Sequence, residues 1–170
     1  RVIAFRDFYV DGDQAMQTSP FFSLPQERDA FATFVGRLRA DGGGDEPENG
    51  LEALSLAFKS DWAKGSGRRR QIVVVWTDAS CHALEKNISA KPSNYPIDIP
   101  RNFDELADWW QGQTYLSHTA KRLLIFAPDA YPWTEIANHW DNVVHFPSKA
   151  GDGLSDVDYS AILEVIANSV

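Results

Sequence analysis

Acidic side chains that could bind a metal ion occur in three separate stretches of the sequence. In residues 42–48, Asp45, Glu46, Pro47 and Glu48 follow three consecutive glycines. Two further acids, Asp7 and Asp78, each come shortly after an apolar run. Carboxylate oxygens are the ligands that hard cations such as Mg²⁺ and Ca²⁺ prefer. These residues therefore indicate a divalent-cation site, provided that the fold brings them together.

The glycine-rich stretch also has a purely structural interpretation. Asp45 followed by Glu48 matches the pattern of a capped helix start, and Pro47 suits a first helical turn. A helical apolar pattern with Leu51 and Leu54 begins directly afterwards. By itself, the stretch is thus either a helix cap or part of a metal-binding loop.

Apolar runs and helical patterns alternate along most of the chain, which indicates an α/β fold. Strands are predicted at residues 2–5, 15–22, 72–76, 123–126 and 143–146, with helices beginning near Ser23, Glu48, Asn102, Pro132 and Ser155. The first two strands are expected to form an antiparallel pair. The alternation after residue 45 predicts a doubly wound, mostly parallel, Rossmann-like sheet with helices on both faces and one antiparallel edge strand.

The predicted fold brings the three acidic stretches to one edge. Ligands of open α/β sheets bind beyond the carboxyl ends of the strands. Asp7 and Asp78 both occupy that position, and the loop at residues 42–48 belongs to a crossover that reaches the same edge. Acids held close together must protonate, repel or share a cation. This convergence favours the metal-binding interpretation over the helix cap.

The composition limits the domain count and the classes of partner. A chain of 170 residues and 19.0 kDa predicts a single domain spanning residues 1–170. The net charge of −8 argues against nucleic acid as a partner, since such binding rests on clustered basic residues. No apolar run approaches the roughly 20 residues of a membrane span. The single cysteine, Cys81, excludes an internal disulfide, and nothing in the sequence assigns a cellular compartment.

Three segments in register resemble the von Willebrand factor A (VWA) domain, in the branch that includes the I-like domain of integrin beta subunits. They are residues 4–7 (Ala-Phe-Arg-Asp), residues 45–48 (Asp-Glu-Pro-Glu) and residues 73–78 (Val-Val-Val-Trp-Thr-Asp). The resemblance implies a metal-ion-dependent adhesion site (MIDAS), at which Mg²⁺, or Mn²⁺ or Ca²⁺ in its place, captures an Asp or Glu carboxylate from a protein partner.

The resemblance also implies roles for particular residues. Glu48 and Asp78 correspond to ligands of the MIDAS cation. Asp7, Asp45 and Glu48, with the carbonyl of Pro47, correspond to ligands of a second, neighbouring cation. Gly43 stands where the family has an asparagine ligand of that second site, so this site is expected to have one ligand fewer.

One part of the family pattern is missing. The first strand of the family and its Asp-x-Ser-x-Ser loop have no counterpart, because the similar spacing at residues 156–160 lies within a helical pattern. The sheet order of the family places that strand between the strands at residues 2–5 and 72–76. Since neighbouring strands lie about 4.8 Å apart, the gap would be roughly 10 Å wide. We therefore expect an N-terminally incomplete domain in which residues upstream of Arg1, another segment or a second chain fills this place.

Several other residues are expected to have structural roles. Cys81 and His82 lack the spacing of a zinc site, and as sequence neighbours they are a poor nucleophile and base pair. Trp76 is expected to form a wall of the acidic site. The proline-rich stretch around Tyr95 is interpreted either as a recognition loop or as a surface insertion.

These observations predict a non-enzymatic, divalent-cation-dependent module for adhesion or scaffolding. One alternative is a Mg²⁺-dependent phosphohydrolase or phosphotransferase with Asp78 as nucleophile or ligand. Ser80 argues against it, because haloacid-dehalogenase-like enzymes carry a second aspartate at that position. The other alternative is a degenerate VWA domain that binds its partner without metal.

Overall fold

A parallel three-stranded sheet forms the centre of the computed structural model, which describes residues 1–39, 46–63, 69–84, 92–148 and 158–169. Its strands are β3 (Gln71–Trp76), β4 (Lys121–Pro128) and β5 (Val143–Ser148), in the order β3-β4-β5. β4, the middle strand, is buried along nearly its whole length. This burial explains its continuous apolar sequence, since a strand covered on both faces has no polar side to alternate with.

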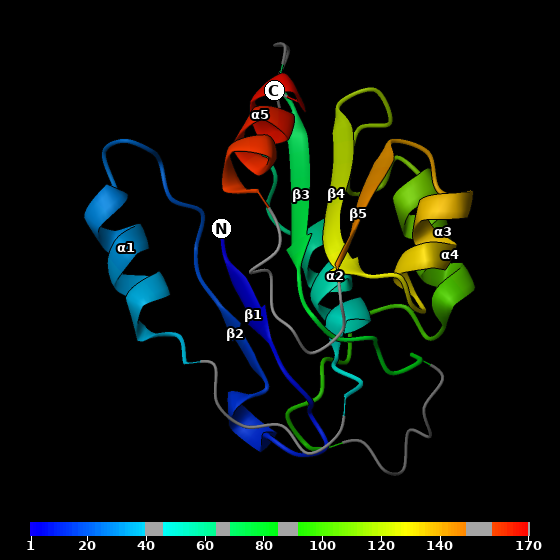
Figure 1. Ribbon diagram of the computed structural model, residues 1–170. Coiled ribbons are helices and arrows are strands. Elements are labelled where there is room, and N and C mark those ends of the chain that lie inside the picture. Colours follow the sequence, from blue (N-terminus) through cyan, green and yellow to red (C-terminus); the bar gives the residue numbers. More distant parts are fainter. Residues whose placement is uncertain (40–45, 64–68, 85–91, 149–157, 170) are drawn as a thin grey trace.

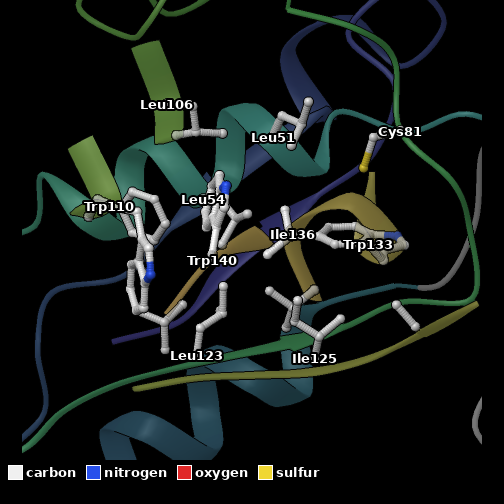
Figure 2. Close-up of a cluster of buried hydrophobic side chains, with 14 of the residues drawn as sticks. Leu51, Leu54, Cys81, Leu106, Trp110, Leu123, Ile125, Trp133, Ile136 and Trp140 are labelled. Carbon is white, nitrogen blue, oxygen red and sulfur yellow. The ribbon is translucent and has the colours of Figure 1, made fainter. Parts of the chain in front are cut away.

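Helices cover both faces of this sheet (Figure 1). On one face lie α2 (Gly50–Phe58), α3 (Phe103–Gln111) and α4 (Trp133–His139), which share one apolar cluster with the sheet. On the other face, α5 (Tyr159–Ser169) packs through Ile162. Figure 2 shows the larger cluster, which includes the leucines of α2, Trp110 of α3, Ile136 of α4 and Leu123 and Ile125 of β4. None of the helices in the described part of the chain is long and apolar enough to cross a membrane.

The N-terminal strands form a separate antiparallel pair. β1 (Ile3–Phe5) pairs with β2 (Met16–Thr18), and a short 3-10 helix (Gly12–Gln14) lies in the connection between them. The antiparallel pairing of these two segments is therefore confirmed. In the described residues this pair shares no strand ladder with β3. The structure thus confirms a mixed α/β fold. Its described strands form one parallel three-stranded sheet and one antiparallel two-stranded sheet.

Most predicted elements are present, and some of their ends differ. Asn102 caps α3 by accepting a hydrogen bond from the Glu105 amide at 2.8 Å, as the sequence predicted. α2 begins at Gly50, with Asn49 preceding it, so Glu48 lies before the helix and not in its first turn. Because Glu48 is outside the helix, it cannot be the first-turn residue of a helix cap. The other half of that pattern, Asp45, lies outside the described residues.

The remaining helix lies apart from the three-stranded sheet. α1 (Arg28–Arg37) has no fully buried residue, and it stands beyond the hairpin in Figure 1. Phe31 and Phe34 both pack against the ring of Phe22, with ring centroids 5.8 and 6.4 Å away. α1 is thus held by a local aromatic contact while its other side chains remain largely exposed.

Candidate functional site

The segment before α2 joins the carboxyl end of β1 to the chain that leaves β3. Glu48 pairs with Cys81 in an isolated parallel bridge. In that bridge the Glu48 amide donates to the Ser80 carbonyl, and the Glu48 carbonyl accepts from the His82 amide, each at 3.0 Å. The next amide, that of Asn49, donates to the carbonyl of Arg6 at 3.2 Å. These backbone bonds gather the predicted acidic segments at one edge of the fold.

Glu48 and Asp78 both line a groove of about 770 Å³. Its sides are the edges of β1 and β3, and its floor is formed by Ala53, Leu54 and Ala57 of α2. The prediction that these two acids lie at the same rim is therefore in agreement with the structure. Trp76 lines the groove as well and is 42% exposed.

Asp7 lies deeper in the protein and is only 1% exposed. One of its carboxylate oxygens accepts from the Tyr9 amide at 2.8 Å, and the other lies 3.2 Å from Nε2 of His82. The His82 ring meets the Tyr9 ring edge-on, with centroids 5.6 Å apart. Asp7 therefore faces a buried imidazole, and it does not line the groove that Glu48 and Asp78 share.

A second buried carboxylate, Glu52, lies one helical turn after Glu48. It is 1% exposed, and the Tyr95 hydroxyl donates to its Oε1 at 2.5 Å. Burial and the Glu52 carboxylate together raise the pKa of Tyr95 far above its usual value of about 10. Burial, and then the carboxylates of Glu52 and Asp7, also raise the pKa of Tyr9. Glu52 and Asp7 thus belong to one buried network with two tyrosines and His82.

Asn49 and Gly50 hold this edge together by close packing. The fully buried Asn49 accepts the Phe8 amide on its Oδ1 at 2.7 Å, which fastens the end of β1 to the start of α2. A Cβ at Gly50 would lie 2.6 Å from the Cys81 sulfur. Burial raises the pKa of the Cys81 thiol well above its usual value, so the thiol stays protonated and is a poor nucleophile.

The predicted metal ligands are thus distributed over two environments. Glu48 and Asp78 line the groove, Asp7 faces His82, Pro47 is half-buried just before Glu48, and Asp45 lies outside the described residues. Among the residues that the structure describes, no group of three or more His, Cys, Asp or Glu side chains is placed to hold a metal ion. Among the described residues, a cation shared by Glu48 and Asp78 would have these two carboxylates as ligands, and water or a partner could supply others.

Sequence reasoning missed three members of the buried network. Glu52 occupies a position in an otherwise apolar helix, and nothing in its spacing marks it as special. His82 and Tyr95 were interpreted as loop residues, but they are 9% and 8% exposed. The residue type was the one signal in the sequence that could have pointed to Tyr95, because a buried tyrosine hydroxyl usually finds a hydrogen-bond partner.

A comparison with curated proteins finds a distant relative. No family model matches the chain, and no solved structure matches it. The chain is 26% identical over 171 residues to the alpha-protein kinase vwkA of Dictyostelium discoideum. The match includes 95% of this chain and spans 26% of the length of that relative.

This relative corrects one prediction from the sequence. A non-enzymatic module was predicted, but the name of the relative describes a kinase, and this similarity points to an enzyme. The prediction rested on the resemblance to the VWA domain and on the adhesion site that it implies. That reasoning does not extend to a longer protein, because a region that binds partners can belong to the same polypeptide as a catalytic domain.

Proposed function

We propose that this chain is a VWA-like region that binds a protein partner for an enzyme related to the alpha-protein kinase. The observation that carries the proposal is the position of Glu48 and Asp78, which come from different segments and line the same groove. The order of elements supports the VWA resemblance, with a hairpin followed by strands and helices that cover both faces of a parallel sheet. In this proposal the hairpin and the sheet are two parts of one doubly wound fold.

The chemistry of these two acids fits a weakly coordinated Mg²⁺ ion. Magnesium is commonly bound in proteins by one or two carboxylates, and water molecules complete its octahedral shell. Glu48 and Asp78 would hold the ion, and Mn²⁺ or Ca²⁺ would find the same oxygen donors. The bound ion would supply positive charge for an Asp or Glu carboxylate of the partner, and charge-assisted contacts of this kind are among the strongest polar interactions.

The proposal does not require the second cation site that the resemblance implies. Both oxygens of Asp7 already have contacts, with the Tyr9 amide and with His82. The carbonyl of Glu48 likewise accepts the His82 amide. Among the described residues, the proposed cation therefore depends on Glu48 and Asp78.

Titration calorimetry with Mg²⁺ and Mn²⁺ tests the proposed site. The chain is expected to bind the ion, and Glu48→Gln is expected to weaken binding by roughly tenfold or more, because losing even a supporting group costs a metal site that much. Glu46→Gln is the matched control, since Glu46 is exposed and lies two residues away. It should leave the affinity unchanged. An equal affinity in the Glu48→Gln variant would exclude Glu48 as a ligand.

The kinase name of the relative favours a second candidate function, in which these residues carry out Mg²⁺-dependent phosphotransfer themselves. Asp78 would then be a metal ligand or nucleophile. ATP turnover by residues 1–170 with Mg²⁺ separates the two functions. Turnover that is abolished in Asp78→Asn would support phosphotransfer, whereas Mg²⁺ binding without turnover would support the binding region.

A further inference from the structure

A second cavity lies between the β1–β2 hairpin and the end of α1. Its volume is about 640 Å³, and it shares no lining residue with the groove that Glu48 and Asp78 line. One wall consists of hairpin residues between positions 6 and 17, and the other consists of Arg37 and Arg39. In Figure 1, the C-terminal end of α1 lies toward the same end of the hairpin as the 3-10 helix. The cavity therefore belongs to a part of the fold that the proposed cation site does not use.

The charge of this cavity is opposite to that of the whole protein. Among its described lining residues are three arginines, Arg6, Arg37 and Arg39, and one acid, Asp11. Three positive charges and one negative charge leave a net charge of +2, whereas the complete chain carries −8. The cavity thus attracts anions locally, on a protein whose overall charge repels them.

Arg6 and Asp11 largely balance each other. Nη1 of Arg6 lies 4.0 Å from Oδ1 of Asp11, and the two side chains are 20% and 7% exposed. Nη2 of Arg6 also donates to the carbonyl of Arg39, which ties the hairpin to the chain that follows α1. Because Asp11 offsets the charge of Arg6, the net positive charge of the cavity belongs to Arg37 and Arg39.

Arg37 and Arg39 lie in the last turn of α1 and just beyond it. Both are exposed, and in the described part of the chain the guanidinium group of Arg37 has no hydrogen-bond or ion-pair partner. Nη1 of Arg39 donates to the carbonyls of Gly36 and Leu38 at 2.9 and 3.0 Å, which offsets the partial negative charge of the helix end. A guanidinium group donates through a planar fork that matches two oxygens of a phosphate. The fork of Arg37, and Nε with Nη2 of Arg39, can therefore bind one phosphate between them.

Two glutamines of the hairpin line the same cavity. Nε2 of Gln17 donates to Oε1 of Gln14 in a long hydrogen bond of 3.5 Å. Among the described residues, this bond leaves the amide nitrogen of Gln14 as a donor and the amide oxygen of Gln17 as an acceptor. One donor and one acceptor match the C=O and N–H groups of a peptide backbone. The cavity thus offers contacts to a main chain as well as to an anion.

We propose that this cavity binds a phosphorylated serine or threonine of a partner polypeptide. Arg37 and Arg39 bind the phosphate, and Gln14 and Gln17 bind the main chain beside it. A phosphate monoester carries a charge of about −1.5 to −2 at pH 7, which matches the two arginines that have no acidic partner in the cavity. The inference rests on the proposed function in one respect, that the partner is a protein, and it requires no metal ion.

The lining residues favour this ligand over other anions. Arginine clusters are a recurrent means of recognising phosphorylated peptide motifs. A nucleotide or a phosphotyrosine would also need an apolar surface for its ring, and Val10 is the single apolar residue among the described lining residues. An aspartate or glutamate of the partner would carry only one charge. Phosphoserine and phosphothreonine supply the larger charge without a ring to bury.

Titration calorimetry on residues 1–170, in EDTA and about 0.15 M salt, tests the site. The probe is a short capped peptide of glycine and alanine with a central phosphoserine, so the phosphate is its only charged group. We expect Arg37→Gln to weaken binding by about tenfold or more, because it removes charge-assisted hydrogen bonds. Arg28→Gln is the matched control, since Arg28 is exposed at the other end of α1 and does not line the cavity. It removes the same charge and should change the affinity by less than about twofold, because salt screens distant charges.

NMR spectra of the same samples locate the peptide. The side-chain amide signals of Gln14 and Gln17 should shift when the phosphopeptide is added. They should shift less with inorganic phosphate, which has no main chain to bond. The backbone amide signals of β4 should be the same in the Arg37→Gln variant as in the natural chain, which shows that the variant is folded.

Several results would overturn the proposal. Equal binding of a peptide with glutamate in place of phosphoserine would show that one negative charge is enough. Equal binding of inorganic phosphate or glucose 6-phosphate would identify a small phosphate compound as the ligand. An equal loss in Arg28→Gln would show attraction by overall charge without a specific site.

Two further results would also contradict it. One is a phosphopeptide that does not bind at all. The other is binding to phosphatidylserine vesicles, but not to the peptide, that Arg37→Gln abolishes, because the ligand would then be a membrane surface. The cation site is tested separately with Mg²⁺ and Glu48→Gln, and EDTA removes divalent ions here. Either test can therefore fail without the other.

Discussion

Two acids that are almost fully buried, Asp7 and Glu52, have protein partners that come from distant parts of the sequence. His82 lies against Asp7, and the Tyr95 hydroxyl donates to Glu52. Burial disfavours the charged form of a carboxylate, and hydrogen bonds to that form offset the cost. The sequence suggested a cation for the acids at this edge. For these two acids, the described contacts come instead from His82, the Tyr9 amide and the Tyr95 hydroxyl.

Removing the Tyr95 hydroxyl should destabilise the fold. Tyr95→Phe leaves the Glu52 carboxylate buried without this donor, and losing one partner of a buried hydrogen bond costs about 1–3 kcal/mol. Tyr131→Phe is the control, because Tyr131 is 41% exposed and its change should stay within about 0.5 kcal/mol. Urea denaturation measures both free energies of unfolding, and equal values would contradict the role of the Tyr95–Glu52 contact.

The same variant should alter the dependence of stability on pH. The pKa of Tyr95 is raised in the folded protein, so the folded state holds this proton more tightly than the unfolded chain does. Its contribution is complete below the unfolded pKa of about 10 and is lost as the pH rises above that value. Tyr95→Phe should therefore lose less stability between neutral and strongly alkaline pH. Tyr9 and Lys121, whose pKa values are also shifted, remain in both proteins, and their effects largely cancel in the comparison.

At the scale of elements, the start of α2 is fixed by close packing against the chain that follows β3. A Cβ on Gly50 would lie 2.6 Å from the Cys81 sulfur and 3.0 Å from atoms of the Trp133 ring. The Trp133 ring is held in turn, because its Nε1 donates to the Ala79 carbonyl at 2.9 Å. A helix with a larger first residue would have to move away from this edge.

Two glycine substitutions test this packing against helix propensity. Gly50→Ala should destabilise the protein by about 1–3 kcal/mol, the usual cost of overpacking a core. Gly36→Ala should stabilise it by up to about 1 kcal/mol, because Gly36 lies within α1 and a Cβ there meets nothing within 4 Å. Thermal unfolding gives both values. A stabilising Gly50→Ala would show that α2 does not need this close approach.

The ends of two elements depend on side chains that fold back onto the backbone. α2 ends at Phe58. The Trp62 Nε1 donates to the carbonyls of Ala57 and Phe58 at 3.0 and 3.2 Å, which satisfies the end of the helix. In β4, the fully buried Lys121 donates to the Trp110 carbonyl and lies over the Trp110 ring, so the strand begins earlier than its apolar run.

At the scale of the whole molecule, the hairpin and the three-stranded sheet are linked through α2 and the edge around Glu48. α2 contacts β1 and belongs to the same apolar cluster as β3 and β4. In the described residues, no strand ladder joins β1 to β3. Packing against α2 and the backbone bonds around Glu48 therefore connect the two sheets, whose described strands share no ladder.

Hydrogen exchange in the free chain should follow this arrangement. Amides of β4, such as Leu124, are bonded within the middle strand and should exchange slowest. The amides of Ile72 and Val74 point away from β4 and have no ladder partner among the described strands, so they should exchange faster than those of Val73 and Val75. Alternating protection along β3, measured by NMR, would support this, and uniform protection would contradict it.

The sequence alone determined the kinds of element and much of their order. β-branched runs identified β3 and β5, the Asn102 cap identified α3, and turn signals predicted the antiparallel pair. These signals are local, because strand and helix propensity and capping depend on residues a few positions apart. The sequence also predicted that Glu48 and Asp78 share one rim, since the carboxyl ends of parallel strands meet at the same edge.

Only the tertiary structure decided which acids face solvent and which are buried. Asp7 and Asp78 both follow strands, yet Asp7 faces His82 inside the protein and Asp78 lines the groove. Glu52 gains its hydrogen bond from Tyr95, a residue 43 positions away. Burial and hydrogen bonding of an ionisable group depend on atoms that chain topology brings from distant segments, and residue type and spacing do not encode these contacts.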